Sequence, residues 1–211
     1  MDGLLVDSEP LWREAELEVL RALGVPLRAA DCAATQGWRV DAVVRHWRAR
    51  HPWEGPSDQE VAQRIGAAVV ARVRARAEPK RGVAHALAVV GALGVPAAVV
   101  SSSAPAIIRA VVERLGIAPR FAALVSADGL PQGKPHPAVY LHAARVLGVE
   151  PAGCVALEDS PSGVRSARAA GMRCLAVPDQ GILPREVAEA DRVLGSLEEL
   201  TAELLRGGPA R

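Results

Sequence analysis

Lysine is scarce in this chain of 211 residues: among 25 basic residues only Lys80 and Lys134 are lysines, and the others are arginines. This bias reflects genome composition more than electrostatics. The 24 acidic residues leave a formal net charge of +1. The chain therefore lacks the basic field that nucleic acid or an anionic membrane would require, and neither partner is expected. A lysine in this chain is therefore notable, and Lys134 is considered below as a functional residue.

Aromatic residues and paired cysteines are also rare. Aromatics make up 3% of the chain, so the core must be aliphatic. The three cysteines, Cys32, Cys154 and Cys174, are far apart and form no Cys-x-x-Cys pair. They are expected to be reduced thiols that fill apolar space, rather than disulfides or zinc ligands, which favours a cytoplasmic protein.

No uninterrupted hydrophobic run predicts a membrane span. The strongest candidate, residues 83–100, is broken by Gly91, Gly94 and Pro96 and divides into an amphipathic helix, a turn and a buried strand. The pattern of a signal peptide is also absent at the N-terminus, so none is expected.

The chain divides into two parts with different hydrophobic patterns. Up to residue 77 the apolar residues recur at helical spacing, and Ser57 and Glu60 have the spacing of a capping box. After Pro79, short apolar runs alternate with helical patterns, which is typical of a parallel sheet wound with crossover helices. Strands are predicted near 96–100, 122–126, 154–157, 173–177 and 192–194, and helices near 83–93, 105–115, 136–147, 161–170 and 196–205.

These patterns predict an α/β fold, with a doubly wound parallel sheet and an inserted helical block. Residues 1–11 and 78–211 are expected to form the core, and residues 12–77 the insert. In such sheets ligands bind beyond the carboxyl ends of the strands, so the polar residues that follow each strand are the candidates for chemistry.

Three serines and a lysine follow predicted strands. Ser101, Ser102 and Ser103 precede a helix that begins near Pro105, where free backbone N–H groups can bind an anion. A plain serine-rich helix cap is the alternative interpretation. Lys134 lies in the segment Gly-Lys-Pro-His-Pro, whose prolines stiffen the loop and hold the ammonium as a fixed point charge.

Two adjacent carboxylates, Glu158 and Asp159, end a third predicted strand. Adjacent acids repel each other unless a cation is present. Magnesium suits them, since it takes oxygen ligands and usually only one or two carboxylates from the protein. A solvated surface pair or a helix cap is the alternative.

The first residues carry a further carboxylate on a turn. Asp2 is followed by Gly3, which allows the backbone to turn sharply. Asp7, Ser8 and Pro10 then mark the start of a helix. Asp2 is therefore expected on a loop that faces solvent.

The opening run, Asp-Gly-Leu-Leu-Val-Asp-Ser-Glu-Pro-Leu-Trp, resembles the first motif of the haloacid dehalogenase superfamily of phosphohydrolases, Asp-x-Asp-Gly, with the continuation found in its sugar-phosphate phosphatases. Ser101, Lys134 and the Glu-Asp-Ser-x-x-Gly run from Glu158 match the superfamily's later motifs. The resemblance covers most of the chain and is to the 2-deoxyglucose-6-phosphate and hexitol-phosphate phosphatases of the β-phosphoglucomutase-like branch. It implies a Rossmann-like core with a helical cap that closes over the site.

The resemblance also implies a mechanism, in which a carboxylate attacks phosphorus and an aspartyl phosphate forms. Asp2 would protonate the leaving alkoxide and then deprotonate the hydrolytic water. Mg²⁺ would be held by Glu158, Asp159 and the main-chain carbonyl of Asp2. Lys134 would neutralise the phosphoryl charge. The expected ligand is a small-molecule phosphate ester, bound by a monomer.

Substrate contacts are implied in two places. Ser101 would bind phosphate, Ser102 would lend its backbone, and Ser103 would face the sugar. Residues 35–39, Thr-Gln-Gly-Trp-Arg, match the family's specificity loop, which makes Gly37 and Arg39 candidate substrate ligands. A structural salt bridge is an equal alternative for Arg39.

In the family pattern the nucleophilic aspartate would stand immediately before Met1, and the strand that carries it before that. The first strand is thus expected to be largely missing from the given sequence, and this polypeptide by itself to be inactive. A sugar-phosphate phosphatase is the preferred interpretation. A sugar-phosphate mutase of the β-phosphoglucomutase type and a non-catalytic protein that binds phosphate esters are the alternatives.

Overall fold

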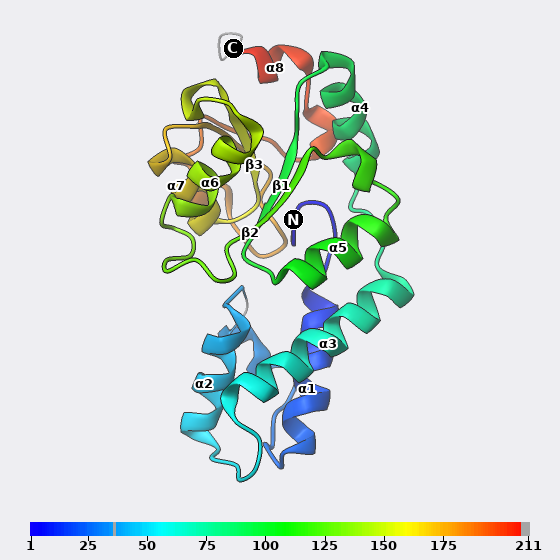
Figure 1. Ribbon diagram of the computed structural model, residues 1–211, viewed down its shortest axis with the longest axis vertical. Coiled ribbons are helices and arrows are strands. Elements are labelled where there is room, and N and C mark those ends of the chain that lie inside the picture. The colour runs from blue at the N-terminus through cyan, green and yellow to red at the C-terminus, as the bar shows by residue number, and fades with distance from the viewer. Residues whose placement is uncertain (36, 208–211) are drawn as a thin grey trace. The chain divides into compact units, whose positions relative to one another are not determined.

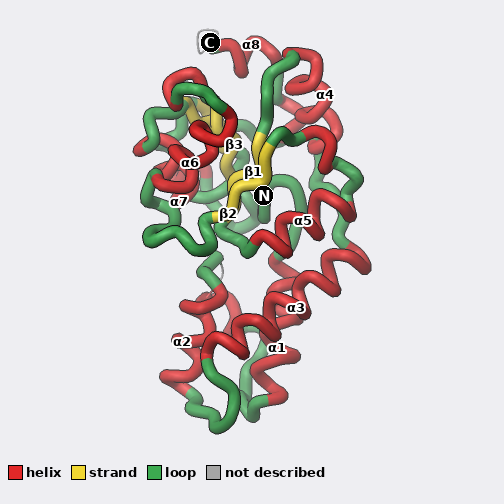
Figure 2. The backbone as a smooth tube through the Cα atoms, viewed as in Figure 1, coloured by secondary structure: helices red, strands yellow, loops and turns green. Residues whose placement is uncertain are grey.

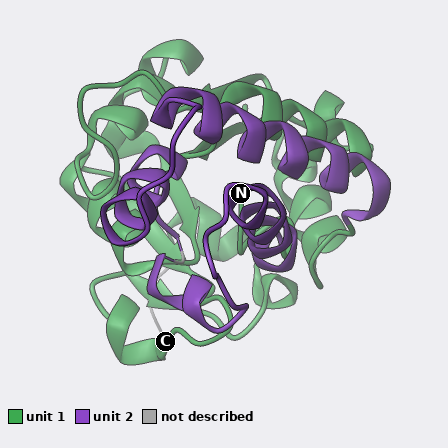
Figure 3. Ribbon diagram, turned by 90° about the horizontal axis from the view of Figure 1, so that it is seen from below, with its two compact units in different colours: residues 1–7, 78–211 green, residues 8–77 purple. Residues whose placement is uncertain are grey.

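The computed structural model describes residues 1–35 and 37–207 of the chain. It divides into two compact units, coloured separately in Figure 3: an α/β unit made of Met1–Asp7 and Glu78–Arg211, and a helical unit made of Ser8–Ala77. The α/β unit thus combines the start of the chain with everything that follows the helical unit.

The α/β unit contains two parallel sheets (Figure 1, Figure 2). β1 (Ala98–Ser101) pairs with β2 (Ala123–Ser126), and β4 (Arg173–Ala176) lies between β3 (Val155–Glu158) and β5 (Arg192–Val193). The predicted strands are confirmed near their expected positions. The expected sheet is present as two separate ladders, since within the described residues no hydrogen-bonded strand joins β1 to β3.

Helices alternate with the strands in the expected order: α4 (Val83–Leu93) precedes β1, and α5 (Pro105–Arg114), α6 (Ala138–Leu147) and α7 (Pro161–Ala169) follow β1, β2 and β3 in turn. Side chains alternate between the two faces of the sheet formed by β3, β4 and β5, and apolar residues lie on both faces. Cys174 and Ala176 pack in one cluster with residues of α6 and α7, whereas Leu175 packs in another with residues of α4.

The prediction of one helix over residues 196–205 is wrong. The segment forms a 3-10 turn, η5 (Leu197–Glu199), and a separate short helix, α8 (Ala202–Arg206). Ser196 caps the first and Thr201 caps the second. Leu200 between them has an extended backbone and a fully buried side chain, and this anchoring interrupts the helix.

The N-terminal segment, Met1–Asp7, is part of the α/β unit. It turns at Gly3, whose φ of 71° suits glycine, and the N–H of Gly3 donates to the Val6 carbonyl at 2.9 Å. Val6 is fully buried and bridges to Pro79, where the chain returns from the helical unit. The two crossings between the units therefore lie side by side within the α/β unit.

The helical unit consists of α1 (Glu9–Ala22), a 3-10 turn over Asp31–Thr35, α2 (Val40–Arg50) and α3 (Asp58–Arg76). Ser57 and Glu60 form the expected capping box on α3. The sequence placed the start of the insert at residue 12, but α1 begins earlier, so the unit starts at Ser8. Throughout the described part of the chain, every helix is too short or too polar to cross a bilayer.

One carboxyl group is buried inside the helical unit. Glu16 on α1 is 7% exposed, and its Oε2 has no hydrogen-bond partner among the described residues. Burial, and then the charge of Glu9, raises the pKa of Glu16 to about 7, although a hydrogen bond with Cys32 opposes the shift. Below neutral pH the folded chain therefore holds this carboxyl largely in its neutral form.

We expect the stability of the helical unit to fall as the pH rises from about 5 to about 8. Because the folded pKa of Glu16 lies above its ordinary value of 4.5, the folded state binds the proton more tightly, and this stabilisation is lost as the pH rises through about 7. Glu16→Gln should remove a loss of about 2–3 kcal/mol over that interval, measured by urea unfolding. Glu18→Gln, at an exposed position of α1, should keep the wild-type slope. Equal slopes in wild type and Glu16→Gln would contradict the prediction.

Candidate active site

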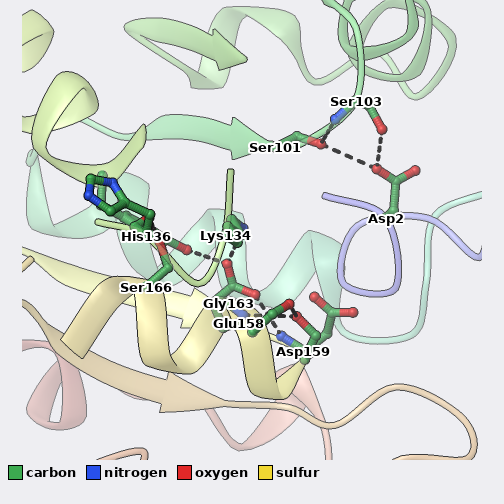
Figure 4. A network of polar contacts seen from close by, with 12 residues as sticks. Asp2, Ser101, Ser103, Lys134, His136, Glu158, Asp159, Gly163 and Ser166 are labelled. Atoms are coloured by element: carbon green, nitrogen blue, oxygen red, sulfur yellow. Dashed lines mark hydrogen bonds and ion pairs between the residues drawn. The ribbon is translucent and has the colours of Figure 1, made fainter. Parts of the chain in front are cut away.

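Polar side chains gather at the carboxyl ends of strands in the α/β unit. β1 ends at Ser101, β3 ends at Glu158, and Asp179 follows β4. Two further contributors come from loops, Asp2 from the N-terminal segment and Lys134 from the connection before α6. Figure 4 shows the arrangement around Asp2, Lys134 and Glu158.

Asp2 is held by two of the predicted serines. The hydroxyls of Ser103 and Ser101 donate to its Oδ2 at 2.8 and 3.3 Å (Figure 4). Ser101 Oγ in turn accepts the N–H of Ser103 at 3.1 Å, which closes the loop that leads to α5. Asp2 is half-buried rather than freely facing solvent, and the loop orients its carboxylate.

Lys134 and Glu158 form a buried ion pair. Their side chains are 10% and 4% exposed, and the ammonium donates to Glu158 Oε1. The hydroxyl of Tyr140 on α6 donates to the same oxygen. Burial by itself would raise the pKa of Glu158, but Lys134, the N-terminal amino group and Tyr140 hold it below its usual value. Burial, and then the charge of Glu158, raises the pKa of Tyr140 well above its usual value, so the phenol remains a donor.

The loop that carries Lys134 is attached to α7. Ser166 on α7 donates its hydroxyl to the His136 carbonyl at 2.7 Å (Figure 4). The ring of His136 accepts the N–H of Ala138 at 3.2 Å, at the start of α6. The position of Lys134 is thus set by the packing of two helices.

Two glycines make room for the acidic pair. A Cβ on Gly163, in the first turn of α7, would overlap the carboxyl group of Glu158. A Cβ on Gly3 would lie 2.9 Å from both the Cγ of Asp159 and the Oδ2 of Asp179. The carboxylates therefore lie directly against backbone, and neither glycine can be enlarged without displacing them.

Asp159 lies close to two other carboxylates. Burial, then the charge of Glu158, with a smaller contribution from Asp179, raises the pKa of Asp159 to about 7, although the charges of the N-terminal amino group and Lys134 oppose the shift. Within the described residues no cationic side chain forms a salt bridge with it. Lys80 instead pairs with Asp179. Both lysines of the chain therefore form ion pairs with carboxylates of this site.

Two of these residues were missed by sequence reasoning. Tyr140 is the only tyrosine of the chain, but its position on the apolar face of a helix predicts burial and not a bond to Glu158. Asp179 does follow a predicted strand, where polar residues are candidates for chemistry. The sequence does not show that it lies beside Asp159 and Lys80.

The donor set at this site fits magnesium. Among the described residues no three His, Cys, Asp or Glu side chains are arranged to hold a metal ion by themselves. Magnesium does not need such a cage, because it retains waters and binds one or two carboxylates together with a phosphate. A carboxyl such as Asp159, which keeps a proton up to about pH 7 next to other acids, is one that a divalent cation can deprotonate.

Gly37 and Arg39 lie in the helical unit. Gly37 has a φ of 73°, and Arg39 Nε forms an ion pair with Asp41 Oδ1 at 3.2 Å. This pair matches the structural alternative for Arg39, and the substrate role of both residues stays a prediction. Gln36 of the same loop lies outside the described residues.

Comparison with known proteins adds to this geometry. The model of the haloacid dehalogenase-like hydrolases matches residues 1–171. Hexitol phosphatase B of Escherichia coli (strain K12) is 45% identical over 210 residues, which cover 98% of this chain and 94% of the relative. CbbY from Rhodobacter sphaeroides, solved in complex with phosphate, is 27% identical with a TM-score of 0.84 and covers 94% of this chain and 92% of its own. A mutant of CbbY solved with xylulose-(1,5)bisphosphate is 28% identical with a TM-score of 0.83 and covers 95% and 93%.

Proposed function

This chain belongs to the haloacid dehalogenase-like hydrolases, and we propose that it is a magnesium-dependent phosphatase of small sugar or polyol phosphates. The observation that carries the proposal is the meeting of Asp2, Ser101, Lys134 and Glu158 at the strand ends of the α/β unit. The hexose or hexitol class of substrate is supported by the extent of the similarity to hexitol phosphatase B.

Each residue has a role that its contacts support. Asp2 moves the proton, to the leaving alkoxide first and from the attacking water afterwards, and the serine hydroxyls keep its Oδ2 oriented. The loop from Ser101 to Ser103 and the N-terminus of α5 supply donors for the phosphoryl oxygens. Lys134, fixed on Glu158, supplies positive charge where charge develops in the transition state.

Asp159, Glu158 and the main-chain carbonyl of Asp2 would hold Mg²⁺. When bound, the ion would shield the phosphoryl charge and help orient the substrate. Glu158 is already neutralised by Lys134, so Asp159 is the carboxylate best placed to bind the ion directly.

The test measures phosphate release from a panel of hexitol and hexose phosphates, 2-deoxyglucose-6-phosphate and phosphoglycolate, with MgCl₂ or with a chelator. The proposed mechanism needs a nucleophilic carboxylate, and none is assigned among the residues above. The assay therefore compares the chain as it stands with a form extended by a strand that ends in aspartate, and with the same extension ending in asparagine.

We expect magnesium-dependent release by the aspartate form, with hexitol or hexose phosphates preferred, and none by the asparagine form. Interconversion of sugar-phosphate isomers without release would identify a mutase instead. Binding of sugar phosphates without turnover by any form would identify a non-catalytic binding protein.

A further inference from the structure

Asp179 occupies a position that the proposed roles do not use. Its side chain is 14% exposed, and its backbone N–H donates to the Asp159 carbonyl at 3.2 Å. Its Oδ1 accepts from the ammonium of Lys80, which lies 99 positions away in the chain. The backbone of Lys80 is itself fixed, because its N–H donates to the Leu5 carbonyl at 3.0 Å.

The carboxylates of Asp159 and Asp179 both approach Gly3. Each lies within contact distance of the position that a Cβ atom on Gly3 would occupy. Asp2 is the residue before this glycine, so its main-chain carbonyl, the one assigned to the cation, lies at the same turn. The Oδ2 of Asp179 faces that turn, while its Oδ1 accepts from Lys80.

We propose that Asp179 adds a carboxylate to the cation site beside Asp159, acting through a water of the ion's hydration shell, and that Lys80 sets the affinity of the site by offsetting the charge of Asp179. This inference rests on the proposed function, since it takes Asp159 to be a ligand of the cation. Magnesium retains several waters when it binds to proteins, and carboxylates that orient such ligands affect affinity strongly.

The competing explanation is that Lys80 and Asp179 form a purely structural tie between two loops. The two explanations predict different signs for the change in cation affinity. If the ion pair is only a structural tie, Asp179→Asn and Lys80→Gln both break it and should shift cation affinity in the same direction. A charge-setting pair should shift affinity in opposite directions, because Asp179→Asn removes a negative charge and Lys80→Gln removes a positive one.

The test uses Mn²⁺ as the probe ion and measures its binding to the full chain by electron paramagnetic resonance, without substrate. We expect Asp179→Asn to weaken Mn²⁺ binding roughly tenfold. Lys80→Gln should tighten it roughly threefold, and Lys80→Arg should leave it unchanged. Arg168→Gln, which breaks the more exposed ion pair with Asp191, is the matched control and should also leave it unchanged. Thermal unfolding of each variant checks that the fold is retained.

The outcomes separate this inference from the proposed function. Mn²⁺ binding that Asp159→Asn abolishes, with no change in Asp179→Asn or Lys80→Gln, would overturn the inference and leave the magnesium site standing. Weaker binding in both Asp179→Asn and Lys80→Gln would make the pair structural. If the wild-type chain binds no Mn²⁺, the cation site of the proposed function fails together with the inference.

Discussion

Lys134→Met is expected to destabilise the α/β unit by about 3–5 kcal/mol, because it leaves the carboxylate of Glu158 buried without its cation. Glu158 is 4% exposed and rests against the backbone of Gly163, so it cannot turn toward water. The remaining hydroxyl of Tyr140 donates one hydrogen bond, which does not replace a charge. The free energy of unfolding, measured in urea at pH 7, checks this expectation.

A second substitution distinguishes an unpaired charge from lost packing. The double variant Lys134→Met/Glu158→Gln removes both charges and keeps both volumes, so it should recover most of the lost stability. The loss in the single variant should also shrink at low pH, where Glu158 is protonated. As a control, Arg81→Gln breaks an exposed pair with Glu198 and should leave the unfolding curve unchanged. A double variant as unstable as the single one would show that packing of the Lys134 stem dominates.

Asp2→Asn is expected to lower kcat on hexitol phosphates by roughly 10²–10⁴-fold in whichever form of the chain shows magnesium-dependent phosphate release. Asparagine can still accept from the hydroxyls of Ser101 and Ser103, so the loop should keep its shape. It cannot donate a proton to a leaving alkoxide. The measurement is steady-state phosphate release at saturating Mg²⁺.

The dependence on leaving group makes this prediction specific to proton transfer. p-Nitrophenyl phosphate releases a stable phenolate that needs no proton, so the first chemical step should be much less affected by Asp2→Asn with that substrate. A burst of p-nitrophenol followed by slow turnover would reveal it. Asp7→Asn, an exposed acid of the same N-terminal segment, is the control and should behave as wild type. Equal losses on both substrates in the first step would reassign Asp2 to a structural role.

The alternating strands and helices of the α/β unit are predictable from the sequence. Strand positions follow from short apolar runs, and the rule that ligands bind at the carboxyl ends of parallel strands is enough to single out Ser101 and Glu158. Strand pairing is not encoded in this periodicity, which is why the division into two ladders was not expected. The break at Leu200 was missed for a related reason, since helical spacing does not show that one residue is anchored elsewhere.

Site residues that depend on distant partners were the least predictable. Tyr140 and Asp179 take part only because helix α6 and the loop after β4 pack beside Glu158 and Gly3. A hydrophobic pattern indicates that Tyr140 is buried, but not what its hydroxyl meets. Lys80 stood out by its rarity alone, and its partner could not be named from the sequence.

The placement of the two lysines makes the site selectively addressable by amine chemistry. Reductive methylation with ¹³C-formaldehyde would modify only Lys80, Lys134 and the N-terminal amino group. Both lysine ammonium groups contact site carboxylates, Lys80 on Asp179 and Lys134 on Glu158. Labels that scatter over the surface of most proteins would here become NMR reporters of the site, and Lys80, at 26% exposed, is the more accessible of the two lysines, against 10% for Lys134.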